Sequence, residues 1–372
     1  MSNTIHSTNN FDFLRIVAAI FVLFTHSFYL QSGQKNLQPF GFLGVGIFFI
    51  ISGYLITQSW NSNPDFWRFL WKRFLRIFPA LFVMCLFVIF IIGPFTTTLP
   101  LYQYFTKSTT YEYIETSSVF YFEHSTIPSV FENNPVKDIV NVSLGTLPIE
   151  FELYIIIAII GVLGIITKRK YLLIAGFFGI LIYTCLVLNT IPMLTSIYDF
   201  LNSIGIASFI IPFVKFTTYI PLSYPTFFLL GSIFYLYKDK INFDYKLVLS
   251  MATTLIICYF YLGMQNPIFL IFLTIFLPYI VLFFGSIKTP LNKFGDYGDY
   301  SYGIYIYGGP IQQMIVSKIP GIGSIELFFI ALGISFIFAF ISWNGIESRA
   351  LKYKSIKFPD FEIFKKFIKN IE

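Results

Sequence analysis

The sequence predicts an all-α membrane protein, a bundle of about ten transmembrane helices with both termini in the cytoplasm. Hydrophobic residues make up 56% of the 372 residues. Charged residues make up only 12%, which is about half the share found in soluble proteins. The mean hydropathy is +0.72, and the 48 Phe and 25 Tyr residues suit contact with lipid. Composition therefore places the chain in the bilayer.

Ten apolar stretches approach the length of about 20 residues that a helix needs to cross a bilayer. They cover residues 11–31, 41–60, 74–95, 147–167, 171–189, 219–237, 246–263, 267–287, 301–318 and 325–346. A further stretch at 200–216 is apolar but interrupted by Gly205 and Pro212, so we interpret it as re-entrant or interfacial. The first stretch lacks a basic leader and a cleavage site, and we expect it to be retained.

Basic residues follow the even-numbered spans. Lys72, Arg73 and Arg76 come after the second span, residues 168–170 after the fourth, and further lysines after the sixth and the eighth. The positive-inside rule then places both termini in the cytoplasm. This arrangement also accounts for the net charge of +6, so no binding to nucleic acid is predicted.

The first span contains two residues that are expensive in a membrane, Arg15 and His26. Eleven residues at about 100° each place both side chains on one helix face, roughly 16 Å apart along the axis. The spacing favours an anion-binding guanidinium near the cytoplasmic surface and an acid/base imidazole deeper in the wall. A snorkelling arginine and a histidine that merely bonds a neighbouring helix are the alternative.

Three further motifs accompany this pair. Arg73 and Arg76 share a helix face and could clamp a phosphate, or could serve only as a positive-inside anchor. Glycines in residues 44–55 allow either close helix packing or an open backbone for a ligand. In Leu147-Pro148-Ile149-Glu150, Glu150 either orients an imidazole or lies among lipid headgroups.

Together these motifs resemble the membrane acyltransferase family 3, the bacterial carbohydrate O-acyltransferases. The resemblance rests on Arg15 with His26, GVGIFFIISGYLI, RFLRIFP, LPIEFELY and the late SYGIYIYGGPI. It covers nearly the whole chain, so we predict one membrane domain at 1–348 and a basic cytoplasmic tail at 349–372. Gly145 stands where many members have Trp, and Gly308-Gly309 where many have His or Trp. We expect a member without the SGNH domain of fused relatives.

The resemblance implies an O-acetyltransferase of the bacterial inner (cytoplasmic) membrane. Its donor would be acetyl-CoA, and its acceptor a hydroxyl of a surface polysaccharide or lipid-linked glycan. Arg15, Arg73 and Arg76 would bind the donor, His26 would act as general base or acyl carrier, and Glu150 would orient the imidazole. No metal is predicted, since all three cysteines lie in apolar runs.

The polar stretch at 96–145 is predicted to face the outside as a structured lip. Its tyrosines would offer stacking faces for sugar rings; these are Tyr102, Tyr104, Tyr111, Tyr113 and Tyr121. Two other functional classes stay open on the sequence alone. One is a proton- or anion-coupled transporter that uses His26 and Arg15. The other is a scaffold that relays acyl groups to a separate transferase.

Overall fold

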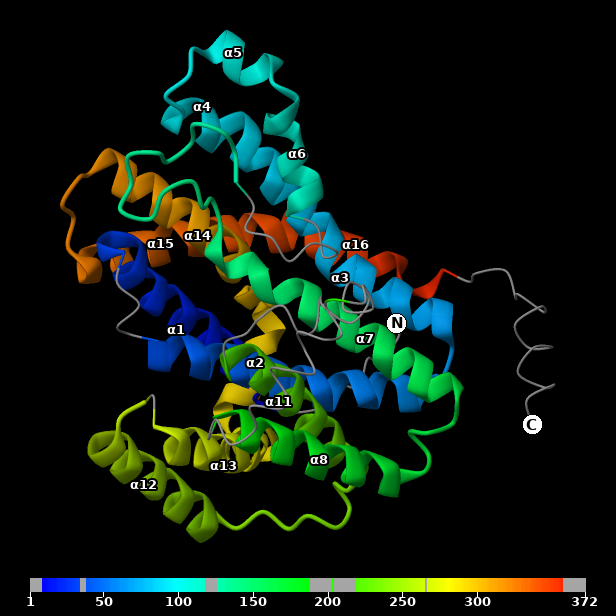
Figure 1. The fold of residues 1–372 in the computed structure, drawn as a ribbon. Coiled ribbons are helices and arrows are strands. Elements are labelled where there is room, and N and C mark those ends of the chain that lie inside the picture. Colours follow the sequence, from blue (N-terminus) through cyan, green and yellow to red (C-terminus); the bar gives the residue numbers. More distant parts are fainter. Residues whose placement is uncertain are drawn as a thin grey trace.

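The fold is helical throughout the part of the chain that the structure, a computed structural model, describes (Figure 1). The structure describes residues 9–33, 38–117, 126–187, 203, 219–264 and 266–356. Within these ranges, extended backbone pairs only at two isolated bridges, Thr97 with Val130 and Thr126 with Ile139. The stretch at 200–216, predicted to be re-entrant, lies almost entirely outside the described residues.

Each predicted span coincides with a helix. These helices are α1 (Phe11–Ser32), α2 (Gln38–Ser62), α3 (Phe66–Phe87), α7 (Leu147–Val162), α8 (Arg169–Val187), α11 (Tyr219–Leu236), α12 (Tyr245–Leu262), α13 (Pro267–Ser286), α14 (Ser301–Lys318) and α15 (Ser324–Ser342). Two of them are extended. A π-helical turn, η1 (Val88–Ile92), and α4 (Gly93–Thr96) continue α3. Beyond α15 follow η4 (Trp343–Glu347), α16 (Ser348–Ala350) and η5 (Leu351–Ser355).

Seven helical stretches in the described residues are long and apolar enough to cross a membrane. They contain α1, α2, α3, α7, α12, α13 and α15. The protein is therefore a multi-pass membrane protein. The count of ten spans, which also needs α8, α11 and α14 to cross, stays a prediction, as does the cytoplasmic placement of the termini.

The position of each helix in the bundle matches its polarity. Helix α14 contains Tyr, Gln, Ser and Gly residues, and nearly all of its side chains are buried among other helices. Helix α12 is the opposite case, since Val248 is its one buried residue and Phe260 and Tyr261 are about four-fifths exposed. Figure 1 shows α12 at the edge of the bundle, beside α13. Its exposed apolar side chains suit a lipid-facing helix.

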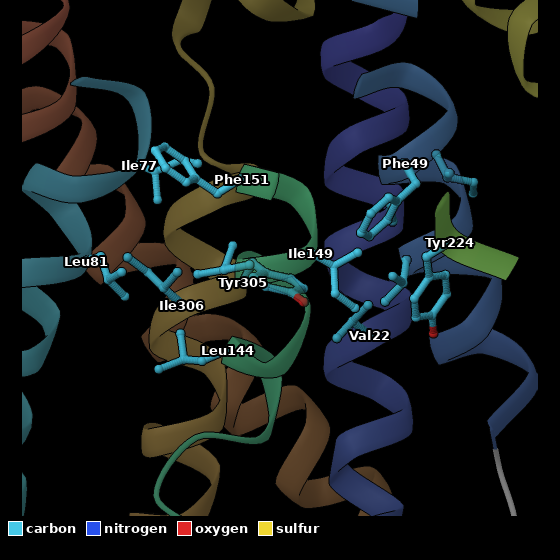
Figure 2. Packing of buried hydrophobic residues seen from close by; sticks show 14 of the residues in the cluster. Val22, Phe49, Ile77, Leu81, Leu144, Ile149, Phe151, Tyr224, Tyr305 and Ile306 are labelled. Carbon is cyan, nitrogen blue, oxygen red and sulfur yellow. The ribbon is translucent and has the colours of Figure 1, made fainter. Parts of the chain in front are cut away.

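One continuous hydrophobic core joins the central helices. Figure 2 shows part of it, with Val22 on α1, Ile149 on α7 and Ile306 on α14. On the far side of α1, the ring of Phe49 on α2 stacks on Tyr224 of α11 with 5.2 Å between centroids. These contacts hold the helices that surround the candidate site in fixed positions.

Glycines of α2 permit its closest contacts. A Cβ atom on Gly44 would lie 2.5 Å from the carbonyl oxygen of Ala18 on α1. One on Gly53 would lie 1.9 Å from the carbonyl oxygen of Phe228 on α11. Backbone therefore packs against backbone at both positions, as in small-residue helix pairs in membranes. Of the two explanations for the glycines of 44–55, close packing accounts for these positions.

The predicted outer segment is structured where it is described. It contains α5 (Leu101–Thr106), α6 (Ser108–Thr116) and the short turn η2 (Val142–Thr146). Figure 1 shows α4, α5 and α6 projecting beyond the rest of the bundle.

The set of tyrosines predicted to stack on sugars must be corrected. Tyr104 and Tyr113 are fully buried, because they pack into the hydrophobic core instead of facing outward. Tyr102 and Tyr111 are exposed. Tyr121 lies outside the described residues.

Candidate active site

A cavity of about 530 Å³ lies among α2, α3, α7, α14 and the turn η5. Along α2 it extends from Val45 to Ser59, which is about 21 Å at the rise of an α-helix. At the Ser59 end it is lined by Arg68 and Lys354, and toward the other end by Thr146 and Tyr305. The cavity is thus a long slot with a basic end.

The three arginines predicted to bind the donor, Arg15, Arg73 and Arg76, all line this cavity. Three more cations, which the sequence analysis did not assign to the site, line it as well: Arg68, Lys72 and Lys354. Lys354 is there because the turn η5 is tied to α3, where the Trp71 indole donates to the carbonyl oxygen of Tyr353 at 3.1 Å. The first residues of the predicted tail therefore form part of the cavity wall.

Arg15 and Arg76 are paired with carboxylates. Arg15 lies 3.1 Å from Asp12 and 3.5 Å from Asp299. Arg76 donates to Asp299 and to Glu347, the latter at 3.3 Å. Burial raises the pKa of Asp299, but the adjacent Arg76 and Arg15 guanidinium groups lower it, and the net pKa lies below the usual value. Two guanidinium groups thus meet three carboxylates, and the cluster has no excess positive charge.

Glu347 is a member of this cluster that the sequence analysis missed. It lies in the π-helical turn η4 and is 1% exposed. The hydroxyl of Ser342 donates to its second carboxylate oxygen at 2.9 Å. A π-turn inserts an extra residue and often marks a functional position. The available signal was a lone carboxylate at the end of the last apolar stretch, a place where charge is expensive.

Arg73 differs from its two neighbours. It donates to the Ser59 hydroxyl at 3.2 Å and lies over the ring of Phe69. Its Nε is buried without a hydrogen-bond partner among the described residues. In the same part of the chain no carboxylate lies within ion-pair distance of it. Arg73 is therefore a cavity-lining guanidinium whose charge is available to an anionic ligand.

Glu150 lies in the cavity wall, one turn into α7. It accepts hydrogen bonds from Ser52 of α2 at 2.9 Å and from the hydroxyl of Tyr154. Glu152, two residues on, is not among the cavity-lining residues. Of these two carboxylates, Glu150 is the one that lines the cavity.

His26 does not line the cavity. Its Nδ1 lies 3.2 Å from the Oγ of Ser143, in the turn η2. The other end of the same turn, Thr146, lines the cavity and hydrogen-bonds Tyr305. His26 and Glu150 thus each form hydrogen bonds with other residues, and no hydrogen bond joins the two among the described residues. Ser143 is a site residue that the sequence analysis did not identify.

Comparison with known proteins shows the family of the chain. The family described as an acyltransferase domain, acyltransferase 3, matches residues 8–344. The chain belongs to the acyltransferase 3 family. It is also 30% identical to an O-acetyl transferase of Shigella phage Sf6 over 376 residues, covering 95% of this chain and 98% of the phage protein. The protein is therefore an O-acetyltransferase of a membrane family.

Two other relatives match over short regions. Nodulation protein 10 of Rhizobium leguminosarum bv. viciae is 45% identical over 82 residues, which cover 20% of this chain and 22% of that protein. The peptidoglycan O-acetyltransferase OatA of Listeria monocytogenes is 39% identical over 87 residues, which cover 21% of this chain and 12% of OatA. No solved structure matches the chain.

The glycines at which this chain departs from the acyltransferase 3 pattern have different surroundings. A Cβ atom on Gly308 would lie 2.6 Å from Leu23, and one on Gly309 would lie 2.5 Å from Oδ1 of Asn141. Space beside Gly145 is open, since a Cβ atom there would meet no atom within 4 Å. At Gly308 and Gly309, neighbouring side chains thus occupy the room that a larger residue would need.

An acyltransferase 3 domain implies an acyl donor, and the residues of the cavity are suited to anions instead of metal ions. Among the described residues, no group of three or more His, Cys, Asp or Glu side chains is placed to hold a metal. The cavity is lined by six cationic side chains and Glu150. Such a lining is typical of a site for phosphate or carboxylate groups.

Proposed function

We propose that this protein moves an acetyl group from cytoplasmic acetyl-CoA to a hydroxyl of a surface polysaccharide or its lipid-linked precursor. The enzyme would act in the bacterial inner membrane, with the acceptor at the outer face. The observation that supports this most is the slot-shaped cavity. Its basic end lies at the predicted cytoplasmic side, and its other end reaches the turn that contacts His26.

Donor binding is proposed at the basic end. Arg73 would take a phosphate group of acetyl-CoA, because its charge is not matched by a carboxylate among the described residues. Arg68, Lys72 and Lys354 would add to the positive field there. Arg15 and Arg76 would form part of the cavity wall. They would contact the donor only if they first broke an ion pair with Asp299 or Glu347.

Glu150 would face the pantetheine arm of acetyl-CoA. The pantetheine arm contains amide N–H groups, which need hydrogen-bond acceptors once they leave water. Glu150, held by Ser52 and Tyr154, is a carboxylate acceptor in the middle of the slot. This role replaces the orientation of the imidazole, since the hydrogen bonds of Glu150 go elsewhere.

His26 would act on the acceptor. As general base, its Nε2 takes the proton of the sugar hydroxyl, and the oxygen attacks the thioester carbonyl. The bond between carbonyl carbon and sulfur breaks, and the CoA thiolate leaves and takes up a proton. Alternatively, Nε2 attacks the carbonyl first and passes the acetyl group to the sugar. Both routes need Nε2 in its neutral form.

The names of two relatives support the transfer of an acetyl group to a glycan. One full-length relative is an O-acetyl transferase, and OatA acts on peptidoglycan by its name. A lipid-linked glycan would present its sugar at the outer membrane–water boundary. Neither the transporter nor the relay scaffold gains support from these names, whereas the enzymatic role does.

The test measures acetyl esters on the surface glycan of the host by NMR, in a deletion strain complemented with variants. Wild type should restore the esters, and His26→Ala should restore none at equal membrane levels. Purified His26→Ala should still bind radiolabelled acetyl-CoA. Arg73→Gln should bind it roughly tenfold or more weakly, because a hydrogen bond to a charged group contributes about 1.5–3 kcal/mol.

Arg169→Gln provides the matched control. Arg169 is an exposed arginine at the start of α8, on the same predicted side of the membrane and outside the cavity. Its replacement removes one positive charge and should leave donor binding and ester content unchanged. If the deletion strain keeps all of its esters, the proposed acceptor is wrong. If His26→Ala restores them fully, the proposed mechanism is wrong.

A further inference from the structure

His26 is held by a residue from a distant part of the chain. Its Nδ1 lies 3.2 Å from Oγ of Ser143, which follows it by 117 positions. Ser143 is 4% exposed. In neutral imidazole one nitrogen carries a proton and the other has a lone pair, and the partner of one nitrogen decides which tautomer is present. The contact therefore fixes how the imidazole ring is turned, and with it the direction in which Nε2 points.

Ser143 is held in place by Asn141. The Asn141 Oδ1 accepts the backbone N–H of Ser143 at 3.1 Å, and this bond caps the turn η2. The Nδ2 group of Asn141 donates to the carbonyl oxygen of Ile306 on α14 at 2.8 Å. Asn141 is 2% exposed, so these bonds are shielded from water. One buried amide thus joins the turn to the central helix of the bundle.

Gly309 makes room for this amide. A Cβ atom there would lie 2.5 Å from Oδ1 and 3.2 Å from Cγ of Asn141. Because α14 is buried on nearly all sides, it cannot move aside to admit a side chain. The close approach of Asn141 to Gly309 sets the depth at which Ser143 meets α1.

The far end of the turn is anchored as well. Thr146 hydrogen-bonds the hydroxyl of Tyr305 on α14, and both residues line the cavity. The turn η2 is therefore fixed to α14 at Asn141 and at Thr146, with Ser143 between these two points. The hydroxyl of Ser143 contributes to neither anchor, and among the described residues its hydrogen-bond partner is His26.

We propose that Ser143 is the positioning residue of His26, and that Asn141 and Gly309 hold it against the imidazole. This inference rests on the proposed function and adds a residue to it. In this arrangement the Nδ1–H of His26 donates to the Oγ of Ser143, and the bond holds the imidazole ring in one orientation. The Nε2 lone pair is then available to take the proton of the acceptor hydroxyl, or to attack the thioester.

The experiment separates transfer from binding. Ser143→Ala removes the hydroxyl and leaves the bonds of Asn141 and Thr146 intact. We expect the initial rate of acetyl-ester formation in cells to fall by about tenfold or more, since positioned acid–base catalysis contributes at least that much. The Kd of the purified variant for radiolabelled acetyl-CoA should stay within about twofold of wild type, because the proposed donor site does not include Ser143.

Two further variants test the chemistry. Ser143→Cys keeps the shape but has a weak acceptor, so it should also lose transfer with donor binding retained. Ser335→Ala is the control, since Ser335 is a fully buried serine on α15 that makes no hydrogen bond with His26 among the described residues. It should transfer at the wild-type rate.

The outcomes are distinct. If wild type forms no esters, the proposed function fails before Ser143 is at issue. If wild type is active, His26→Ala is inactive and the Ser143 variants are as fast as wild type, the function stands and the positioning role is overturned. Equal losses of transfer and donor binding in both Ser143 variants would also overturn it, since they would indicate a structural role. Slow transfer with normal binding supports it.

Discussion

At the scale of single residues, the site divides its positive charges into two groups. Arg15 and Arg76 are bound to Asp12, Asp299 and Glu347. Arg73 contacts a hydroxyl and an aromatic ring instead. An arginine that is paired in the empty site must give up a partner to bind a ligand, whereas Arg73 need not. The two arginines of the Arg-x2-Arg motif thus have different roles.

The paired role of Arg76 predicts a loss of stability when it is replaced. Arg76→Gln leaves Asp299 and Glu347 together without a guanidinium between them. Removing one partner of a buried ion pair costs about 3–5 kcal/mol, and we expect the lower end because the Arg76 side chain is 23% exposed. The measurement is the midpoint of thermal unfolding of the purified protein in detergent, which should fall clearly below wild type.

A second substitution checks the cause. Asp299 still pairs with Arg15, so Glu347 is the carboxylate left without a guanidinium. Glu347→Gln in the Arg76→Gln background removes that charge and should recover part of the lost stability. Arg169→Gln, an exposed charge removal, should leave the midpoint unchanged. An Arg76→Gln protein with the wild-type midpoint would contradict the ion-pair account.

The chemistry-bearing residues of the site could be predicted in part. Arg15, Arg73, Arg76 and Glu150, which the sequence singles out, line one cavity, whereas His26 does not. Spacing within one helix reports which side chains share a face, as it does for Arg73 and Arg76. Their partners could not be predicted. Asp299 meets Arg15 from 284 positions away, and a single sequence contains no signal for a contact between such distant segments.

At the scale of elements, the backbone of α2 contacts the backbone of α11 at two glycines. Gly53 lies against the carbonyl group of Phe228. In the same way, a Cβ atom added to Gly231 would lie 2.2 Å from the carbonyl oxygen of Ile50. These contacts fix α2, which places Ser52 beside Glu150.

The glycines of α2 stand out in the sequence, but their spacing alone left open whether they serve helix packing or the binding of a ligand.

This packing predicts that Gly53→Ala destabilises the bundle. The added methyl would lie 1.9 Å from a backbone oxygen that cannot rotate away, so α2 and α11 must move apart. Overpacking of this kind costs about 1–3 kcal/mol. The matched control is Gly333→Ala on α15, where no atom lies within 4 Å. That change should be neutral or stabilising by up to about 1 kcal/mol.

Thermal unfolding in detergent measures both glycine variants under one condition. The two substitutions add the same methyl group to a membrane helix and differ only in what surrounds it. Gly53→Ala should unfold at a lower temperature than wild type, and Gly333→Ala at the same or a higher one. Equal midpoints for the two variants would show that the close approach of α2 to α11 is not needed for stability.

At the scale of the whole molecule, one set of ion pairs joins four helices on the same side of the bundle. Asp12 and Arg15 begin α1, Arg76 lies in the first half of α3, and Asp299 precedes α14. Glu347 follows α15. This arrangement requires α1, α3 and α14 to run in one direction and α15 in the other. It agrees with the topology predicted from the loop charges.

The number of spans is where hydropathy and packing differ. Helix α14 falls outside the set that is apolar enough to cross by composition, because its polar residues face other helices instead of lipid. Its start lies with the ion pairs, while Gln313 near its end binds the backbone of Val136 and Ile139 in the predicted outer segment. Contacts at both ends therefore favour a crossing that a hydropathy criterion alone does not detect.

Labelling of single cysteines in intact cells distinguishes ten spans from seven. In a variant with its three native cysteines replaced by alanine, Lys318→Cys at the end of α14 lies outside only if α14 crosses. Lys352→Cys in η5 is then inside. With ten spans, an impermeant maleimide should label Lys318→Cys and leave Lys352→Cys unlabelled until the cells are opened. With seven spans, in which α8, α11 and α14 do not cross, Lys352→Cys should be labelled and Lys318→Cys should stay unlabelled until the cells are opened.

Lys107→Cys, which lies in the outer segment by both counts, is the positive control. The ten-span result would place Lys354 and the basic end of the cavity in the cytoplasm, where acetyl-CoA is available, whereas the exchanged result would remove the donor from the proposed site.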